Sequence, residues 1–314
     1  MIKTKILVTG GAGFIGSALV EKLLEKKEYE IVVVDNLLTG NIKKLPQVSN
    51  RLRFIRCDVN NFHEISQIMM AFKFDYVFHY AAIVGVQRTL QHPIEVLNDI
   101  NGIKNILELS KNTGVKRVFY SSSSEIYGEP VEYPQNEDTT PLNSRLPYAI
   151  VKNVGEAYLR AYQKEYGLNY TIFRFFNTYG PKQSKNFVIS KFFHQALTNA
   201  DITIYGDGQQ TRTFCYITDN IDVCISAFYN KKFINDVLNV GGNIPITMNE
   251  LAEKIINITK SKSKIVYLPP LEEGDMRGRK PDIKKMMTLI SKPLIPLDVG
   301  LKMIYKTGLF ENGF

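Results

Sequence analysis

The chain has few residues of the kinds that bind metals or form disulfides. Its 314 residues include three cysteines, Cys57, Cys215 and Cys224, and four histidines. The cysteines are odd in number and show neither metal-binding nor redox spacing, which is typical of a protein kept in a reducing cytoplasm. The histidines are scattered along the chain, so we expect no zinc site and no other metal centre.

The sequence also lacks a long hydrophobic run. No apolar stretch reaches the roughly 20 residues that a membrane-spanning helix needs. The first strand-like segment begins too close to the N-terminus to leave room for a signal peptide. We therefore expect no membrane association and a cytoplasmic location. The composition, 44% hydrophobic and 22% charged, is that of a globular protein with one large core or two lobes.

Positive charge exceeds negative charge, but it is not gathered in one block. The formal net charge is +8, and the lysines are spread along the chain instead of forming the basic patch that nucleic-acid binding requires. The sequence contains no aromatic motif of the RNA-binding type either. An anionic small substrate explains the charge as well, and we expect no nucleic-acid partner.

The most informative segment is the start of the chain, where an apolar run is followed by regularly spaced glycines. The run over residues 6–9 predicts a buried parallel strand, and an amphipathic helix follows the glycines. The backbone N–H groups of such a turn and of the helix N-terminus bind a pyrophosphate. The residues predicted to hold it are Gly10, Gly13, Phe14, Ile15 and Gly16.

An acidic residue at the end of the next apolar run specifies the cofactor. Asp35 follows the last of these glycines by about 20 residues, where a dinucleotide-binding fold places a ribose-binding acid. Its carboxylate can accept a hydrogen bond from the 2′-hydroxyl of NAD and would repel the 2′-phosphate of NADP. Asn36 comes next, and no arginine is adjacent. We therefore predict NAD as the cofactor.

Strand-like and helix-like segments alternate through the first half of the chain. The predicted strands are residues 6–9, 31–35, 53–56, 76–79, 117–121 and 171–175, and 237–240 can add a seventh. The predicted helices include residues 62–71, 102–110 and 148–166. This alternation predicts an α/β fold with a doubly wound, Rossmann-like parallel sheet. We expect an NAD-binding domain over 1–176 and 214–240, and a smaller mixed lobe over 177–213 and 241–314.

Two further segments carry groups suited to acid–base chemistry. Tyr148 and Lys152 are four apart, on one face of a helix. A nearby ammonium lowers the pKa of a phenol and turns it into a usable base, and Lys152 can also hold the nicotinamide ribose. Ser123, Ser124 and Glu125 follow an apolar strand, and polar groups at the carboxyl end of a parallel strand face the ligand crevice.

These segments together resemble the extended short-chain dehydrogenases/reductases that modify nucleotide sugars. The resemblance covers nearly the whole chain and rests on residues 9–16, 35–36, 58–59, 79–82, 121–128, 148–152, 176–181, 204–212 and 279–283. It implies an NAD-dependent enzyme, a nucleotide-diphosphate sugar as substrate with UDP favoured, and a homodimer. The dimer is expected through the helices near 102–110 and 148–166, with Ile106, Leu109 and Leu159 buried in the contact.

The resemblance also implies roles for single residues. It makes Tyr148 the base and Ser123 the hydroxyl that bonds the sugar 4-hydroxyl. Further cofactor contacts, to the adenine and along the cofactor path, are implied for Asp58, Val59, Ala81 and Ala82. Contacts to the nucleotide diphosphate are implied for Asn177, Arg212, Arg277 and Arg279. One position departs from the family pattern: Asp99 stands where the family usually has asparagine, an exchange that can alter a cofactor hydrogen bond.

The resemblance leaves three reactions open, all of which begin with oxidation at C4 of the sugar. Ser124 and Glu125 resemble UDP-glucuronate decarboxylases and also GDP-mannose dehydratases, whereas dTDP-glucose dehydratases usually have an aspartate in place of the serine. Residues 279–283 again resemble the decarboxylases, but residues 81–86 and 274–277 resemble 4-epimerases. We predict decarboxylation of UDP-glucuronate, with UDP-sugar 4-epimerisation and then 4,6-dehydration as alternatives. The nucleotide-sugar lobe argues against a net dehydrogenase, and the presence of Ser123, Tyr148 and Lys152 argues against a non-catalytic NAD-binding protein.

Overall fold

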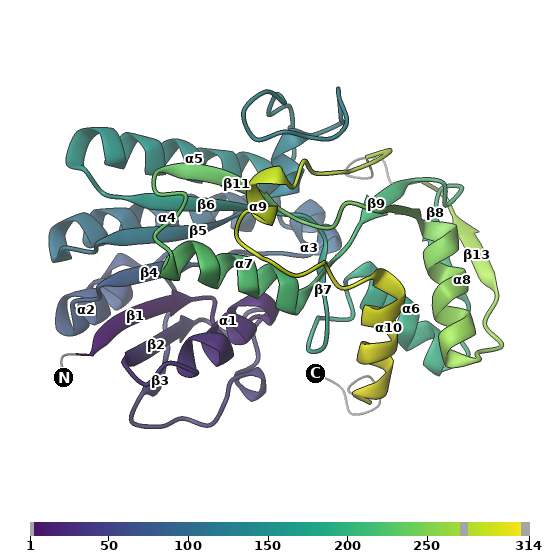
Figure 1. The fold of residues 1–314 in the computed structure, drawn as a ribbon, viewed down its shortest axis with the longest axis horizontal. Helices are drawn as coiled ribbons and strands as arrows, with labels where there is room; N and C mark the ends of the chain where they lie inside the picture. The colour runs from purple at the N-terminus through teal and green to yellow at the C-terminus, as the bar shows by residue number, and fades with distance from the viewer. Residues whose placement is uncertain (1–2, 271–275, 309–314) are drawn as a thin grey trace. The chain divides into compact units, whose positions relative to one another are not determined.

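The computed structural model describes residues 3–270 and 276–308, which form two compact units (Figure 1). Unit 1 consists of Met1–Ile126, Arg145–Arg174 and Ile221–Leu238. Unit 2 consists of Tyr127–Ser144, Phe175–Asn220 and Asn239–Phe314. The lobe expected from the sequence did not include residues 127–144, which the contacts group with unit 2.

Unit 1 is built on a seven-stranded sheet whose order is β11-β6-β5-β4-β1-β2-β3. The strands are β1 (Thr4–Thr9), β2 (Tyr29–Asp35), β3 (Leu52–Arg56), β4 (Tyr76–His79), β5 (Arg117–Ser123), β6 (Tyr170–Phe175) and β11 (Asp236–Val240). Strand β1 pairs in parallel with β2 and β4, and the pairs β2–β3 and β4–β5 are also parallel. The predicted fold class is confirmed. The strand order reverses at β1, where doubly wound sheets bind ligands beyond the strands' carboxyl ends.

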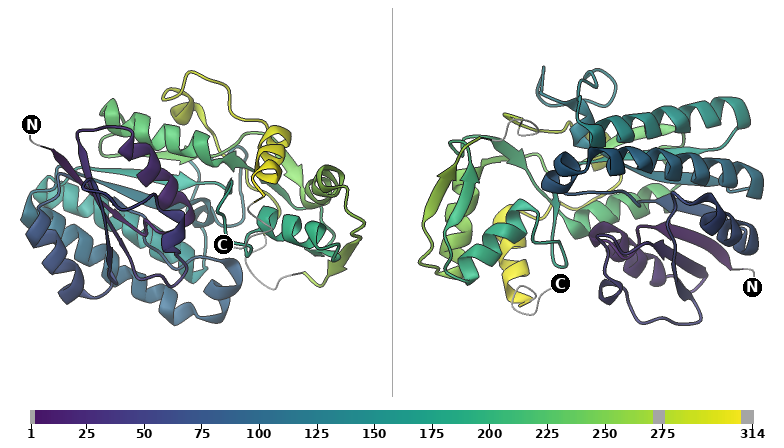
Figure 2. Two further views of the ribbon diagram at one scale, coloured as in Figure 1. Left: turned by 90° about the horizontal axis from the view of Figure 1, so that it is seen from below. Right: turned by 180° about the vertical axis from the view of Figure 1, so that it is seen from behind.

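Helices cover both faces of this sheet (Figure 2). They are α1 (Phe14–Leu24), α2 (Phe62–Phe72), α4 (Pro93–Thr113), α5 (Pro147–Tyr166) and α7 (Ile217–Tyr229), and the short helix α3 (Val86–Gln91) packs against α4. The apolar sides of α2, α4 and α5 share one core with strand residues such as Leu7 and Val77. Helix α4 begins nine residues before the predicted segment because Pro93 occupies its first turn, where proline is well tolerated.

The helix residues expected at a dimer contact lie in this core instead. Ile106, Leu109 and Leu159 are all buried within the single chain, so the prediction that a monomer would expose them is wrong. The physical reason is that an apolar stripe at helical spacing must first cover the sheet beneath it, and periodicity does not distinguish that face from an interface.

Unit 2 contains three two-stranded sheets and four helices among its described residues. The sheets are β7 (Thr178–Tyr179) with β10 (Cys215–Tyr216), β9 (Thr211–Thr213) with β12 (Pro245–Thr247), and β8 (Ile202–Tyr205) with β13 (Ile265–Leu268). The helices are α6 (Val188–Leu197), α8 (Met248–Thr259), α9 (Lys284–Met287) and α10 (Leu297–Lys306). Only the β9–β12 pair is antiparallel within these three sheets, so the strand pairing is mixed.

Residues 127–144 belong to unit 2 because backbone hydrogen bonds tie them there. The Gln135 N–H donates to the Lys280 carbonyl at 2.7 Å, and the Asp282 N–H donates to the Gln135 carbonyl at 2.7 Å. The side-chain amide of Asn239 donates to the same Gln135 carbonyl at 2.9 Å. These partners are more than 100 residues away in sequence, as the Asn239 separation of 104 residues shows, and no local pattern indicates them.

A buried ion pair in unit 1 joins helix α5 to strands β5 and β6. Arg174 donates from Nε to Glu156 Oε1 at 2.9 Å and from Nη2 to Oε2 at 2.8 Å. Ser122 Oγ donates to Glu156 Oε1 at 2.7 Å. The Glu156 side chain is 0% exposed and the Arg174 side chain is 2% exposed. The arginine and the serine hold the pKa of the Glu156 carboxyl below its ordinary value although burial opposes them.

We predict that Arg174→Met lowers the free energy of unfolding by about 3–5 kcal/mol, because it leaves the Glu156 charge buried without its main partner. Arg160→Met is the matched control. Arg160 also contacts Glu156, at 3.0 Å, but its side chain is 43% exposed, so that loss should be only about 0–1 kcal/mol. Urea denaturation measures both variants. Equal losses of unfolding free energy in the two variants would show that burial of the Arg174–Glu156 pair does not contribute to stability.

Candidate functional site

The glycine turn after β1 brings three stretches of backbone into close contact. Gly10 has a positive φ of 66°, and a Cβ atom there would lie 2.6 Å from the Ala81 nitrogen. A Cβ atom at Gly16 would lie 2.3 Å from the Gly10 carbonyl oxygen. Gly13 precedes helix α1 without a capping side chain. The first N–H groups of the helix, beginning at Phe14 and Ile15, are therefore not covered by a cap and can bind an anion.

Asp35 ends strand β2 beside this turn. Its Oδ2 accepts a hydrogen bond from the Ala12 N–H at 3.0 Å, and its Oδ1 accepts one from the Leu37 N–H at 2.8 Å. Burial raises the pKa of the Asp35 carboxyl, while these two N–H groups and the charge of Lys44 oppose the rise. The carboxylate thus lies where a ribose acid was predicted. Asn36 is exposed, and its Oδ1 accepts from the Leu38 N–H.

The ends of β3 and β4 place the other predicted cofactor residues. Asp58 Oδ1 accepts the Asn60 N–H at 2.9 Å, and Val59 is buried. The Ala81 N–H donates to Thr9 Oγ1 at 3.1 Å, and Ala82 follows, half-buried. These loops follow strands of the same parallel sheet, so they emerge at the same sheet edge as Asp35 and the glycines. The uncapped helix, the glycine cradle and the acid together fit a dinucleotide.

Tyr148 and Lys152 face one another on helix α5, as predicted. The Lys152 ammonium is 5.7 Å from the centre of the Tyr148 ring and 5.1 Å from that of Tyr120, and it donates to Ser121 Oγ at 3.4 Å. Burial lowers the pKa of Lys152 to about 8, and the charge of Asp99 opposes this fall. The lysine is therefore still mostly protonated at neutral pH, and its charge lies close to the Tyr148 ring.

The serine segment turns directly beyond β5. Ser123 is the last residue of the strand, and Ser124 and Glu125 begin the 3-10 turn η2 (Ser124–Tyr127). Ser123 Oγ accepts the Glu125 N–H at 3.1 Å. Ser124 is only 2% exposed, and Glu125 is half-buried. The structure therefore brings all five predicted catalytic residues into unit 1.

Sequence reasoning missed one residue that holds this arrangement together. Glu156 continues the face of α5 that carries Tyr148 and Lys152, at the same four-residue spacing. Ser121 and Ser122, just before Ser123, contact Lys152 and Glu156 respectively. The spacing was a visible signal, but the partner Arg174 was not.

Unit 2 brings the four predicted substrate residues together around strand β9. The Thr211 N–H donates to the Arg277 carbonyl at 3.0 Å, and the Arg279 N–H donates to the Thr211 carbonyl at 3.3 Å. Arg212 follows in the strand, and Asn177 Nδ2 donates to the Thr213 carbonyl at 3.0 Å. Their contacts to substrate stay predictions. Gly274 and Asp275, part of one segment compared with epimerases, lie outside the described residues.

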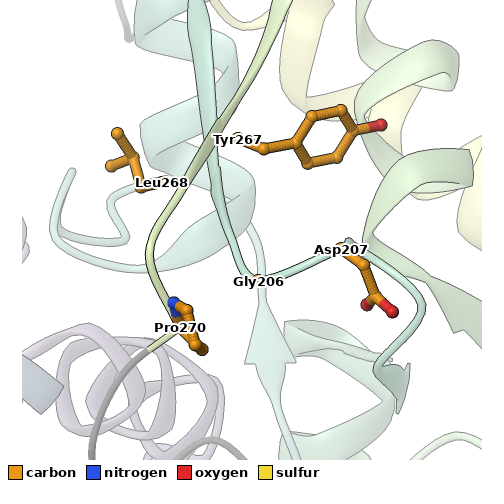
Figure 3. A pocket seen from close by; sticks show the side chains of 5 residues that line it. All are labelled: Gly206, Asp207, Tyr267, Leu268 and Pro270. Atoms are coloured by element: carbon orange, nitrogen blue, oxygen red, sulfur yellow. The ribbon is translucent and has the colours of Figure 1, made fainter.

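A pocket in unit 2 lies at the end of the β8–β13 pair (Figure 3). It is lined by Gly206, Asp207, Tyr267, Leu268 and Pro270. The Gly206 N–H donates to the Leu268 carbonyl at 2.9 Å, which closes the end of the pair. The sequence showed a turn here but gave no reason to expect a pocket, because β8 and β13 are far apart in the chain.

Within residues 3–270 and 276–308 the structure contains neither a metal-binding cluster nor a membrane-spanning helix. No group of three or more histidine, cysteine, aspartate or glutamate residues there is arranged to hold a metal ion. None of the helices in those two ranges has both the length and the apolar character to cross a membrane.

The chain is similar to known proteins over nearly its whole length. The profile of the NAD-dependent epimerase/dehydratase family matches residues 6–241. The chain is 35% identical to the UDP-N-acetyl-alpha-D-glucosaminuronate decarboxylase of Bacillus cytotoxicus, over 96% of each chain. It is 36% identical to a putative UDP-glucose 4-epimerase of Methanocaldococcus jannaschii, over 95% of this chain and 96% of that one. The crystal structure of Thermotoga maritima UDP-glucose 4-epimerase with UDP-glucose matches with a TM-score of 0.91 and 34% identity, over 98% of this chain and 99% of that one.

We predict that the protein binds NAD more tightly than NADP, because Asp35 repels a 2′-phosphate. Asp35→Ala should weaken NAD binding by about 1–3 kcal/mol, the scale of a lost hydrogen bond to a charged group. NADP is the internal control, because the same substitution also removes the repulsion of its 2′-phosphate, so NADP binding should weaken less than NAD binding. Calorimetry measures the affinities of NAD and NADP for the unchanged protein and for Asp35→Ala. NADP binding as tight as NAD binding in the unchanged protein would refute the assignment.

Proposed function

The chain belongs to the NAD-dependent epimerase/dehydratase family, and from that premise we propose that it decarboxylates a UDP-hexuronate through a transient 4-keto sugar. UDP-glucuronate is the first candidate substrate. When bound, NAD supplies the redox chemistry by accepting a hydride from C4 of the sugar and later returning it. The glycines, Asp35 and Lys152 are the residues that would hold it.

The side chains of unit 1 supply the proton transfers. Tyr148 takes the proton of the 4-hydroxyl, and Lys152 stabilises the phenolate that does so. Ser123 Oγ accepts the Glu125 N–H, and we propose that its hydroxyl hydrogen is donated to the 4-oxygen of the sugar. A ketone at C4 is β to the C6 carboxylate, which then leaves as carbon dioxide while its bonding electrons pass to the C4 oxygen. The proton that C5 receives in place of the carboxylate comes from solvent by way of Glu125, and Tyr148 returns its own proton to O4.

The observation that carries this choice is the pair Ser124 and Glu125. Dehydration of the dTDP-glucose type uses an acid beside Ser123 to protonate the departing 6-hydroxyl, and the residue there is a buried serine, whose hydroxyl is a poor acid. Dehydration of the GDP-mannose type, in which the same serine–glutamate pair occurs, stays the third alternative. Decarboxylation has no such need, because carbon dioxide leaves without protonation. It needs one proton donor near C5, a role that Glu125 can fill. The decarboxylase from Bacillus cytotoxicus supports the same reading at 35% identity.

The second candidate is 4-epimerisation of a UDP-sugar. A putative 4-epimerase is as similar to the chain as that decarboxylase, at 36% identity, and the described fold matches a solved 4-epimerase closely. Epimerisation uses the same Tyr148 chemistry at C4 but gives Glu125 no chemical step. The behaviour of Glu125 therefore separates the two candidates.

We propose that unit 2 binds the nucleotide part of the substrate. Asn177 and the three arginines gathered around β9 offer amide and guanidinium donors for a diphosphate. Arg212 Nη1 donates to the Met276 carbonyl at 2.8 Å, and Arg279 Nε contacts Met276 Sδ at 3.2 Å. Met276 thus orients two of the arginines before any substrate binds.

We predict that Glu125→Gln lowers product formation from UDP-glucuronate by about 100-fold or more. Oxidation at C4 survives in this variant, so NADH absorbance should rise and persist after substrate is added. Tyr148→Phe is the contrasting variant, because it should block both the NADH signal and the product. Stopped-flow absorbance and NMR of the products measure these effects. An unchanged rate of epimerisation in Glu125→Gln, with no carbon dioxide from any uronate, would favour the second candidate.

We also propose that the chain acts as a homodimer in the cytoplasm, with the outer sides of α4 and α5 in the contact. Ile150 on α5 and Ile94 on α4 are exposed apolar residues there. Sedimentation should give twice the chain mass of 35.8 kDa at micromolar concentration. Ile150→Glu should shift the protein towards the monomer, whereas Val48→Glu, at an exposed valine elsewhere in unit 1, should not. A native chain that sediments as a monomer would contradict the proposal.

A further inference from the structure

The side chain of Asn239, near the end of strand β11, lies at the centre of a buried hydrogen-bond network in unit 2. The residue is 0% exposed. Its Nδ2 group donates to the Gln135 carbonyl at 2.9 Å and to the Asp282 carbonyl at 3.4 Å. Its backbone N–H donates to Glu137 Oε1 at 2.7 Å. None of these four residues is among the predicted site residues, so the network is not explained by the site described above.

These contacts determine which way the Asn239 amide faces. The two carbonyls can only accept hydrogen bonds, so the NH₂ group must point towards them and the amide oxygen must point away. The amide oxygen, Oδ1, accepts a hydrogen bond from the Tyr127 hydroxyl at 2.8 Å. Tyr127 is itself only 1% exposed. Removal of the Tyr127 hydroxyl would therefore leave a buried amide oxygen without this hydrogen bond, which is unfavourable.

Tyr127 is the last residue of η2, the 3-10 turn that begins with Ser124 and Glu125. At the start of the turn, Ser123 of strand β5 accepts the Glu125 N–H through its Oγ at 3.1 Å. Glu125 is thus held between a strand residue on one side and the buried Tyr127 on the other. A 3-10 turn has few backbone hydrogen bonds of its own, and their geometry is poorer than in an α-helix. The contacts at its two ends therefore decide where its side chains lie.

The Tyr127 ring has a packing partner that does not involve its hydroxyl. The centre of the ring is 6.0 Å from the centre of the Phe176 ring. Phe176 is 0% exposed, and its N–H donates to the Val240 carbonyl at 2.9 Å, one residue beyond Asn239. A phenylalanine at position 127 keeps this ring contact and loses only the hydrogen bond. The contribution of the hydroxyl can therefore be measured separately from that of the ring.

We propose that Asn239 and the Tyr127 hydroxyl anchor the turn η2, and that both are positioning residues for Glu125. Without this hydrogen bond the turn rearranges more readily, and the Glu125 carboxyl spends less time in the place from which it serves C5 of the sugar. The anchor itself does not depend on the proposed function. Its consequence for the protonation of C5 rests on that function.

Hydrogen exchange of the full-length protein measures the anchor without any substrate. In Tyr127→Phe the backbone N–H groups of residues 124–127 should exchange about tenfold faster, the factor that corresponds to one lost hydrogen bond. Exchange in strand β5, residues 117–123, is the internal reference and should not change. Unchanged exchange at residues 124–127, or an equal acceleration throughout β5, would overturn the anchor.

Tyr179→Phe is the matched control, because it removes the same atom from an equally buried tyrosine of unit 2. Tyr179 is also 1% exposed, but its hydroxyl makes no hydrogen bond to any residue that the structure describes. The control should leave exchange at residues 124–127 unchanged, and an effect as large as that of Tyr127→Phe would contradict a specific anchor. If Tyr127→Phe does not fold, Asn239→Ser removes the acceptor of the same hydrogen bond and leaves room for a water molecule.

The consequence for catalysis is measured with UDP-glucuronate by stopped-flow absorbance. In Tyr127→Phe the oxidation at C4 should keep its rate, because Tyr148 and Lys152 lie on helix α5, whereas product formation should fall about tenfold. NADH absorbance should therefore rise and persist, which a general loss of structure would not produce. Loss of the NADH signal together with the product would overturn the positioning role.

Glu125→Gln separates a failure of this inference from a failure of the proposed function. If Glu125→Gln stops product formation but Tyr127→Phe does not slow it, the positioning role is overturned and the proposed function stands. If neither variant slows turnover, or if the unchanged protein converts no UDP-uronate, the proposed function is contradicted. Faster exchange at residues 124–127 in Tyr127→Phe would still support the anchor in that case.

Discussion

The arrangement of the proposed catalytic groups depends on the buried contact between helix α5 and the end of strand β5. Two successive serines of the strand, Ser121 and Ser122, meet Lys152 and Glu156 of the helix. Arg174 binds both oxygens of Glu156 from the next strand. Because a buried charge without its partner is strongly unfavourable, the helix cannot slide along the strand, and Tyr148 keeps a fixed place relative to Ser123.

The charge states of neighbouring groups in unit 1 depend on their burial and on one another. Lys152 is buried deeply enough for its pKa to fall to about 8, yet it retains its charge at neutral pH. That charge favours ionisation of the adjacent phenol. The glycines leave room for the predicted pyrophosphate at the uncapped start of α1, and Asp35 lies beside them. Unit 1 therefore carries both the predicted cofactor residues, which lie at strand ends, and the proposed base Tyr148, which lies on helix α5.

Local features of the site could be predicted from the sequence, and long-range ones could not. Each predictable feature lies within a single turn, strand or helix: the glycine turn, Asp35 at the end of a strand, and the spacing of Tyr148 and Lys152. Glu156 meets Arg174 across 18 residues, and Asn60 meets Asp99 across 39, contacts that depend on how the strands are ordered. Ile106 was misassigned to an interface for a related reason: an apolar stripe shows that a face is covered, but not what covers it.

The most direct test of transient oxidation at C4 follows deuterium placed on that carbon of UDP-glucuronate. The purified protein with NAD should release carbon dioxide and form a UDP-pentose that still carries the deuterium at C4, as read by NMR. Release of carbon dioxide requires a ketone at C4, so retention of the deuterium in the decarboxylated product shows that the hydrogen that left C4 returns to the same carbon. Deuterium lost to solvent or found in free NADH would contradict decarboxylation through a returning hydride at C4.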